Sequence, residues 1–295
     1  MAGDMAGLSR RTPRRIAISG AGGNLGRKLM PALAEIDSVK AIIALDRQPP
    51  GDAAGFAKAD WREADLTQPL DAWRHHLDGV DTIIHLAATN PHPDSGWNHA
   101  FASFEITARL TQLSLSEGVE RLVFASSNHA MGGYFDADGP QVETGWLKGT
   151  TPSRPGTKWV GGGEAHNSTI YGASKGFGEH LLCVAAEAGG GKLSTIAVRI
   201  GWVQPGENRY ETIGSEGVST EKPSDPNENT TPAGRWFRGM WLSNRDLVQL
   251  GRLCVEVSAD NWPGPHIVVN GVSDNADSPW SFEDAANLLG YRPRN

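Results

Sequence analysis

The sequence predicts an α/β protein built on a doubly wound parallel sheet, and three observations lead to that fold class. Short apolar runs recur along the 295 residues, and most are followed by a stretch whose apolar residues recur at helical spacing. The runs are continuous and do not alternate with polar residues, which is typical of strands covered on both faces. The first run leads into a glycine-rich turn at the start of the first helix. Strands that alternate with helices in this way form parallel sheets through right-handed crossovers.

The expected elements follow the chain in a regular order. Residues 15–19 form the first strand, and the helix after the glycine-rich turn carries Leu25, Leu29 and Leu33 on one face. The pattern continues as strand 39–45, helix 70–77, strand 82–86, helix 101–115, strand 121–125, helix 169–188 and strand 193–200. This alternation predicts helices on both faces of the sheet.

Two long stretches interrupt the alternation. Residues 136–167 and 204–234 are rich in Gly, Pro, Thr and Asn and show little periodicity. Stretches of this kind are usually lids or binding loops and are otherwise disordered, so both alternatives stay open. Beyond them, helix 244–257, strand 266–269 and helix 281–289 predict a small C-terminal lobe on the carboxyl edge of the sheet.

Composition and charge exclude several classes of protein. A hydrophobic share of 39% with 21% charged residues excludes a disordered chain, and no apolar run approaches the roughly 20 residues that span a bilayer. The net charge of −7 argues against a nucleic-acid partner. Basic residues cluster only near the N-terminus, at Arg10, Arg11, Arg14 and Arg15, and we expect residues 1–14 to form a flexible tail. Cys183 and Cys254 are too few for a disulfide framework or a zinc site, so we expect no metal and a reducing, cytoplasmic location.

The glycine-rich turn has the spacing of a dinucleotide-binding turn. Gly20, Gly23 and Gly26 follow the first strand and open the first helix, whose free N–H groups and dipole attract a pyrophosphate. Asp46 ends the second strand, where an acid binds the adenosine ribose and repels a 2′-phosphate. This favours NAD over NADP, although Arg47 offers a partner for such a phosphate. The alternative is an ordinary turn between a strand and a helix.

A second motif places Tyr171 four residues before Lys175 on one face of a predicted helix. A Tyr hydroxyl has a pKa near 10 and is a poor base at neutral pH, but a nearby cation favours the phenolate. The strand that ends at Ser126 and Ser127 brings a hydroxyl to the same edge of the sheet. The alternative is a surface pair without a role in chemistry.

With these motifs the chain resembles the extended short-chain dehydrogenase/reductase superfamily, in the NAD-dependent epimerase/dehydratase family. Residues 124–132, 198–201, 240–246 and 271–275 further resemble uronate dehydrogenases and haloarchaeal NAD-dependent glucose-6-phosphate dehydrogenases. The resemblance implies a Rossmann-type sheet that binds NAD as cofactor. It divides the chain into a tail, an NAD-binding domain that carries the catalytic residues (15–203) and a substrate lobe with a polar, lid-like insertion (204–295).

The resemblance also implies the site residues, with Ser127, Tyr171 and Lys175 as the catalytic group. The implied cofactor contacts are Gly20, Gly23, Asn24, Leu25, Gly26, Asp46, Arg47, Asp65, Leu66, Leu86, Ala87, Ala88, Tyr171, Lys175 and Ile200. The implied substrate contacts are Asn90, Ser127, Asn128, His129, Tyr171, Arg209, Arg235 and Arg238. Trp202 departs from the small polar residue that related proteins often have there.

The expected function is that of an NAD-dependent sugar 1-dehydrogenase. Its substrate would be an aldose with an anionic C6 group, such as a hexose 6-phosphate, a uronate or a 6-sulfo sugar, and its product the lactone. An arginine fork suits such an anion. Helices 101–115 and 169–188 carry apolar residues on more than one face, which predicts a homodimer. The alternatives are a nucleotide-sugar epimerase or dehydratase, and a non-catalytic dinucleotide-sensing protein.

Overall fold

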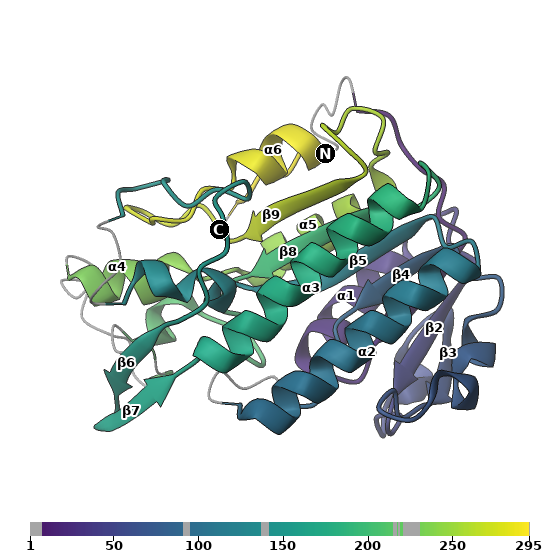
Figure 1. Cartoon of the computed structure of the whole chain (residues 1–295), viewed down its shortest axis with the longest axis horizontal. Coiled ribbons are helices and arrows are strands. Elements are labelled where there is room, and N and C mark those ends of the chain that lie inside the picture. Colours follow the sequence, from purple (N-terminus) through teal and green to yellow (C-terminus); the bar gives the residue numbers. More distant parts are fainter. Residues whose placement is uncertain are drawn as a thin grey trace.

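Seven parallel strands form the central sheet of the protein (Figure 1). The computed structural model describes residues 8–90, 95–136, 142–214, 217, 219–220 and 231–294. In spatial order the strands are β3 (Ala59–Glu63), β2 (Ala41–Asp46), β1 (Arg15–Ser19), β4 (Thr82–His85), β5 (Arg121–Ser127), β8 (Ser194–Ile200) and β9 (His266–Gly271). The order reverses between β1 and β4, and in such sheets ligands bind at the carboxyl ends of the strands beside this point.

Helices cover both faces of the sheet, as the sequence predicts. Helices α2 (Trp97–Ser116) and α3 (Thr169–Ala188) lie side by side on one face. Helices α1 (Asn24–Ala34), α5 (Asn244–Glu256) and α6 (Glu283–Leu289) pack on the other. The strands are buried from both sides, which explains their unbroken apolar runs.

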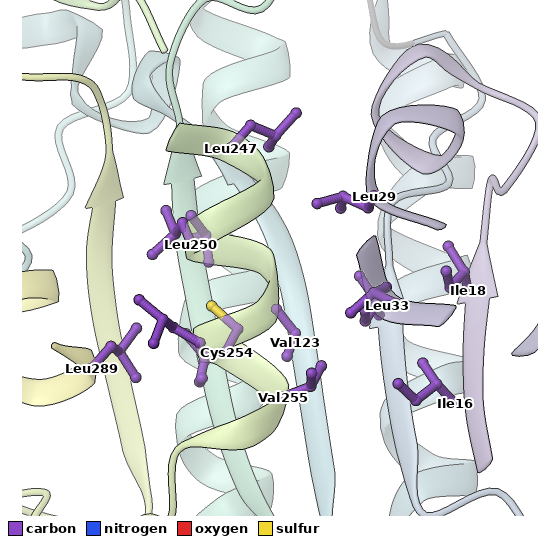
Figure 2. Close-up of a cluster of buried hydrophobic side chains, with 14 of the residues drawn as sticks. Ile16, Ile18, Leu29, Leu33, Val123, Leu247, Leu250, Cys254, Val255 and Leu289 are labelled. Carbon is purple, nitrogen blue, oxygen red and sulfur yellow. The ribbon is translucent and has the colours of Figure 1, made fainter. Parts of the chain in front are cut away.

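Alternate residues of β1 enter the two cores. Ile16 and Ile18 face the core that contains Leu29 and Leu33 of α1, while Ala17 packs in the core under α2 and α3. Figure 2 shows the first of these cores, where α1 and α5 face each other above the sheet and the Cys254 thiol lies among apolar side chains. The described residues include no helix long and apolar enough to cross a membrane.

The structure corrects several expected elements. Residues 70–77 form two short 3₁₀ turns, Leu70–Ala72 and Arg74–Leu77, instead of one helix, and the helix expected from residue 101 begins at Trp97. No apolar run predicts the edge strand β3. Its burial is incomplete because it lies at the sheet edge and carries Asp60, Arg62 and Glu63.

The first irregular stretch contains an antiparallel hairpin of β6 (Lys158–Gly161) and β7 (Glu164–Asn167). Its two-residue turn, Gly162 and Gly163, has positive φ at both positions, as a tight type I′ turn requires. The second irregular stretch contains the turn Tyr210–Thr212 and the start of α4 (Pro232–Gly239), where Thr231 caps the helix. Residues 137–141, 215–216, 218 and 221–230 of the two stretches lie outside the described residues.

The C-terminal segment is more closely joined to the sheet than expected. Strand β9 pairs with β8 along its whole length, and α5 packs against α1. The expected tail is also partly attached, because Arg10 forms a β-bridge with Val257 and Arg11 forms an ion pair of 2.9 Å with Glu120. Residues 1–7 lie outside the described residues.

Candidate active site

The glycine turn joins β1 to α1 in a conformation that depends on its first and third glycines. Gly20 has φ of +74°, and a Cβ there would lie 2.9 Å from the Ala87 nitrogen. A Cβ at Gly26 would collide with the backbone of Ala21. These two glycines therefore let the turn lie against β4 and the first turn of α1, and α1 directs its first N–H groups at the carboxyl edge of the sheet.

Asp46 closes the turn from the end of β2. Its Oδ2 accepts a hydrogen bond of 2.8 Å from the Gly22 N–H, and its Oδ1 accepts one of 2.8 Å from the Arg47 N–H. The carboxylate is thus fixed at the rim of the turn, where the sequence predicts the ribose-binding acid. The Arg47 side chain is exposed beside it.

A cavity extends from Asp46 along the ends of β2 and β4. Its lining includes ten predicted cofactor positions or their direct neighbours: Gly20, Gly23, Leu45, Asp46, Arg47, Asp65, Leu66, Leu86, Ala87 and Ala88. The Thr67 hydroxyl and amide donate hydrogen bonds that hold the pKa of the Asp65 carboxyl below its usual value. Asp65 therefore stays an anionic hydrogen-bond acceptor at this end of the cavity.

A second cavity of about 400 Å³ adjoins the first and shares Gly20, Gly23, Leu86 and Ala88 with it. It leads past the start of α1 to the predicted catalytic side chains. The two cavities thus lead from Asp46, the predicted ribose-binding acid, past the start of α1 to the predicted catalytic side chains. The residues present fit a bound dinucleotide on this arrangement of acid, glycine turn and helix start.

The structure brings Ser127, Tyr171 and Lys175 together in the lining of this second cavity. Ser127 ends β5, and the other two lie one turn apart on α3. The Lys175 Nζ lies 5.7 Å from the centre of the Tyr171 ring. Burial raises the pKa of the Tyr171 hydroxyl to about 12, although its hydrogen bond with Ser127 acts to lower that pKa. Burial therefore opposes the phenolate form of Tyr171, and the role of Lys175 in favouring that form stays a prediction.

A buried ion pair connects the elements that carry Ser127, Tyr171 and Lys175. Arg199 on β8 binds Glu179 on α3 through two hydrogen bonds of 3.0 and 2.8 Å, and both side chains are at most 4% exposed. The Ser126 hydroxyl donates a third bond of 2.6 Å to the Glu179 carboxylate. This network joins α3, β5 and β8 through Ser126, the residue before Ser127, and so fixes the elements that carry the three predicted catalytic side chains.

Asn128 and His129 follow Ser127 in a 3₁₀ turn and also line the cavity. The Ser127 hydroxyl donates to the Asn128 Oδ1 at 3.1 Å and accepts from the His129 N–H at 3.2 Å. The His129 imidazole packs 6.0 Å from the Tyr171 ring, centre to centre. Both residues lie where the sequence predicts contacts to a sugar.

The rest of the cavity wall could not be predicted from the sequence, which marks only Trp202 as unusual. It is formed by large apolar side chains and one glycine: Trp159, Trp202, Gly217, Phe237 and Met240. Trp159 belongs to the hairpin, and Phe237 and Met240 come from α4 and its end. Two local patterns in the sequence are typical of these elements. The Gly162–Gly163 pair is typical of a tight hairpin turn, and Thr231 followed by Pro232 is typical of the start of a helix.

The predicted anion-binding arginines do not line the described part of the cavity. Arg209 is 60% exposed beside Glu207, and Arg235 directs its guanidinium to the Asp277 carbonyl and the Thr144 hydroxyl. Arg238 is 3% exposed, and its guanidinium lies 4.9 Å from the centre of the Tyr210 ring. Another predicted contact, Asn90, is exposed and is also absent from this lining.

A parallel sheet with this turn and a Ser-Tyr-Lys group at its switch point defines a dinucleotide-dependent enzyme of the short-chain dehydrogenase/reductase type. The chain belongs to the NAD dependent epimerase/dehydratase family, whose model matches residues 16–216. This confirms the family predicted from the motifs.

Named relatives narrow the comparison. The chain is 31% identical to the L-arabinose 1-dehydrogenase (NAD(P)(+)) of Haloferax volcanii over 95% of its own length and 96% of the relative's. It is 29% identical to the NAD-dependent glucose-6-phosphate dehydrogenase of the same organism, over 95% and 93% of the two chains. A solved structure of a mutated uronate dehydrogenase superimposes with a TM-score of 0.67 at 25% identity, over 96% of this chain and 82% of the other. All three names are those of sugar dehydrogenases.

Proposed function

We propose that the protein is an NAD-dependent sugar 1-dehydrogenase, which oxidises the anomeric CH–OH group of an aldose to the lactone. The observation that carries this proposal is the convergence of Ser127, Tyr171 and Lys175 on a cavity continuous with the glycine turn and Asp46. The relatives support the same reaction class, since they are named as dehydrogenases of arabinose, glucose 6-phosphate and uronates.

Each side chain of the group has a distinct task. Ser127 donates a hydrogen bond to the anomeric oxygen, and Tyr171 as phenolate takes the proton of that hydroxyl. Lys175 places a positive charge next to the Tyr171 ring, which favours the phenolate, and any further positive charge near the hydroxyl acts in the same direction. NAD, when bound, accepts the hydride from C1. Gly20, Gly23, Asn24, Asp46 and Asp65 would hold the dinucleotide, with Leu66, Leu86, Ala87, Ala88 and Ile200 along its sides.

The sugar's anionic C6 group, as in a hexose 6-phosphate, a uronate or a 6-sulfo sugar, remains part of the proposal. Arg238 is its best-placed candidate partner, because Phe237 and Met240 on either side of it line the cavity. A guanidinium binds carboxylate, phosphate and sulfonate alike through paired hydrogen bonds. Arg209 and Arg235 have partners that direct them elsewhere.

Accumulation of free NADH distinguishes this function from its alternatives. Purified protein is mixed with NAD and a panel of L-arabinose, D-galactose, D-glucose, D-glucuronate, D-galacturonate, glucose 6-phosphate and 6-sulfoglucose, and absorbance at 340 nm is followed. A sugar dehydrogenase converts NAD stoichiometrically with one class of these sugars. A nucleotide-sugar epimerase or dehydratase gives no net NADH but alters a UDP-sugar, and a dinucleotide sensor does neither.

A homodimer through α2 and α3 is also proposed. Four large apolar side chains on these helices are exposed by 63% or more: Trp97, Phe101, Phe177 and Val184. Exposed apolar groups in such number on two neighbouring helices are typical of a face that a partner covers. The partner we infer is a second copy, whose own α2 and α3 supply a matching apolar face. A cytoplasmic location belongs to the same proposal and rests on the free thiols of Cys183 and Cys254.

A further inference from the structure

Lys28 lies on α1, one helical turn after Asn24. Its Nζ atom donates three hydrogen bonds, to the Gln204 carbonyl at 3.0 Å, to the Gly206 carbonyl at 2.9 Å and to the Asn244 Oδ1 atom at 2.5 Å. An ammonium group has three hydrogens and no lone pair, so these three acceptors use its whole bonding capacity. Since the reaction described above gives Lys28 no task, this arrangement needs another explanation.

The Asn244 side chain binds the same part of the chain. Asn244 is the first residue of α5, and its Nδ2 atom donates to the Gly206 carbonyl at 2.9 Å and to the Glu207 carbonyl at 3.2 Å. The Gly206 carbonyl thus accepts hydrogen bonds from both side chains. Lys28 and Asn244 together hold residues 204–207, which we call the anchored segment, to α1 and to the start of α5.

A buried asparagine joins the anchored segment to the residues that follow it. Asn208 is 4% exposed and has φ of +54°, in the left-handed region that asparagine tolerates better than most residues. Its Oδ1 atom accepts from the Gln204 N–H at 2.9 Å, and its Nδ2 atom donates to the Leu242 carbonyl at 2.7 Å. A displacement of Gln204 therefore acts directly on Asn208.

The residues on both sides of the anchored segment belong to the proposed sugar site or support it. Val203 lines the active-site cavity, and its carbonyl accepts a hydrogen bond of 3.0 Å from the Asn24 side chain. The Tyr210 ring lies 4.9 Å from the guanidinium carbon of Arg238, the candidate partner of the sugar's anion. The position of the anchored segment therefore affects two parts of the sugar site.

We propose that Lys28 is a positioning residue for the sugar, which holds the anchored segment on the cofactor-binding helix and so keeps Val203 and Tyr210 in place before the sugar binds. Lys28 is absent from the described lining of the cavity, so it acts through the segment and not by contact with the sugar. A segment that is ordered in advance costs the ligand less binding free energy than one that the ligand must order. This inference rests on the proposed function, because it presumes that a sugar occupies the cavity.

The order of the segment is measured without turnover. Hydrogen exchange of the full chain, followed by mass spectrometry, reports on the peptide of residues 203–213, in which the backbone N–H groups of Gln204 and Thr212 are hydrogen-bonded. We expect exchange in this peptide to become about tenfold faster in Lys28→Met and in Asn244→Ala. Unchanged exchange in both variants overturns the proposal.

Arg27→Met is the matched control, because it removes a neighbouring positive charge from the same helix. The Arg27 guanidinium pairs with the Asp52 carboxylate at 2.6 Å and makes no hydrogen bond to the anchored segment, every residue of which the structure describes. This variant should leave both the exchange of the peptide and the KM for the sugar unchanged. Equal effects of Arg27→Met and Lys28→Met would assign the result to charge near the cofactor and overturn the proposal.

Kinetics then test the consequence for the sugar, with the best substrate of the panel. Lys28→Met and Asn244→Ala should each raise the KM for that sugar by about tenfold, because the sugar must now order the segment. The kcat and the dissociation constant for NAD should stay within about threefold of the wild type, since neither side chain touches the reacting groups. An unchanged KM in both variants overturns the proposal, because a role in folding alone lowers the amount of active enzyme and not its KM.

The double variant tests whether both side chains act on the same segment. Lys28→Met combined with Asn244→Ala should raise the KM by no more than about threefold beyond either single variant, because the segment can be released only once. Multiplication of the two single effects would show independent action and overturn the shared role. Circular dichroism shows which variants retain the fold, and Asn244→Ala provides the test should Lys28→Met be poorly folded.

Failure of the wider function gives a different result. If no sugar in the panel produces NADH while the peptide exchanges faster in both variants, the sugar dehydrogenase assignment fails and the role of Lys28 in holding the segment stands. If sugars are oxidised while exchange or KM is unchanged in both variants, the proposed function stands and this inference fails.

Discussion

The Nζ atom of Lys175 donates a hydrogen bond of 2.8 Å to the carbonyl oxygen of Ala125, two residues before Ser127. The ammonium group is therefore fixed between α3 and the end of β5, in a position that is 5% exposed. Burial lowers its pKa to about 8 because the charged form has lost most of its water. The proposed reaction needs the positive charge of Lys175, whereas burial of that charge lowers the stability of the fold.

Lys175→Met should stabilise the fold while abolishing activity. A pKa lowered from 10.5 to about 8 corresponds to a cost of about 3 kcal/mol for the charged form in the folded chain. Loss of the bond to Ala125 offsets about 1 kcal/mol of the gain. We expect the free energy of unfolding to rise by about 2 kcal/mol at pH 7, measured by urea denaturation.

The pH dependence of this difference has a definite sign. Between pH 8 and 10.5 the unfolded wild-type chain binds more protons at Lys175 than the folded chain. The free energy of unfolding of the wild type therefore rises with pH relative to that of the variant. The advantage of Lys175→Met should therefore be largest below pH 8 and shrink toward pH 10.5. An advantage that is constant across this range would show that packing, and not charge burial, is responsible.

Tyr171→Phe should lower kcat by about 10²- to 10⁴-fold, the usual contribution of a general base. The variant removes only the hydroxyl, so the ring contact with His129 remains. The dissociation constant for NAD, measured by fluorescence or calorimetry, should stay within about twofold of the wild type. Turnover near the wild-type rate would exclude Tyr171 as the base.

Asp46→Ala should raise the KM for NAD and relax the discrimination against NADP, because it removes the ribose acceptor and the charge that repels a 2′-phosphate. Asp46→Asn is the matched variant, since its amide oxygen can still accept from the Gly22 N–H and keep the turn in place. The ratio of kcat/KM with the two cofactors should change in both variants. A wild type that already prefers NADP would show that Arg47, and not Asp46, determines the cofactor preference.

Arg238→Ala should raise the KM for the best anionic sugar by about ten- to hundredfold and leave a neutral aldose nearly unaffected, as expected for loss of a charge-assisted contact. Arg235→Ala is the control on the same helix, because the Arg235 guanidinium binds Asp277 and Thr144 outside the cavity lining. Equal losses for both sugars would instead indicate disturbed packing around Tyr210.

Phe177→Glu should convert a dimer into a monomer, because it places a charge in the exposed apolar face of α2 and α3. Val160→Glu is the control, since Val160 is 66% exposed on the hairpin, away from that face. Light scattering at micromolar concentration gives the mass of each variant. A wild-type mass near 31.6 kDa would end the dimer proposal.

The fold could be predicted wherever a residue's surroundings are set by its neighbours in the chain. The run that contains Ile42 and Ile43 is buried on both faces and reads as a strand, and Gly20 leads into a helix whose leucines repeat at helical spacing. Strand β3 carried no such pattern, because an edge strand is covered incompletely and tolerates Asp60 and Arg62. Its place depends on pairing with β2, which is a tertiary contact.

The same distinction applies to the site, where the predicted cofactor and catalytic positions follow from local patterns and the rest of the cavity wall does not. Asp46, Ser127 and Tyr171 sit at strand ends or on a helix, so their positions follow from the fold. The cavity wall depends instead on how separate segments meet, as when Trp159 of the hairpin packs against Phe237 of α4. The directions of the arginines are likewise set by partners far away in sequence, such as Tyr210 under Arg238. Contacts between segments that are far apart in the sequence leave no local pattern from which they could be predicted.

Strand β9 lies near the C-terminal end of the chain, and this position has a consequence for synthesis of the protein. Until His266–Gly271 emerge from the ribosome, β8 has no neighbour on one side, although its residues are almost entirely buried in the finished sheet. An apolar edge strand is a template for pairing with another polypeptide. A nascent or prematurely terminated chain that ends between β8 and β9 should therefore aggregate or require a chaperone, even though it already contains every proposed catalytic residue.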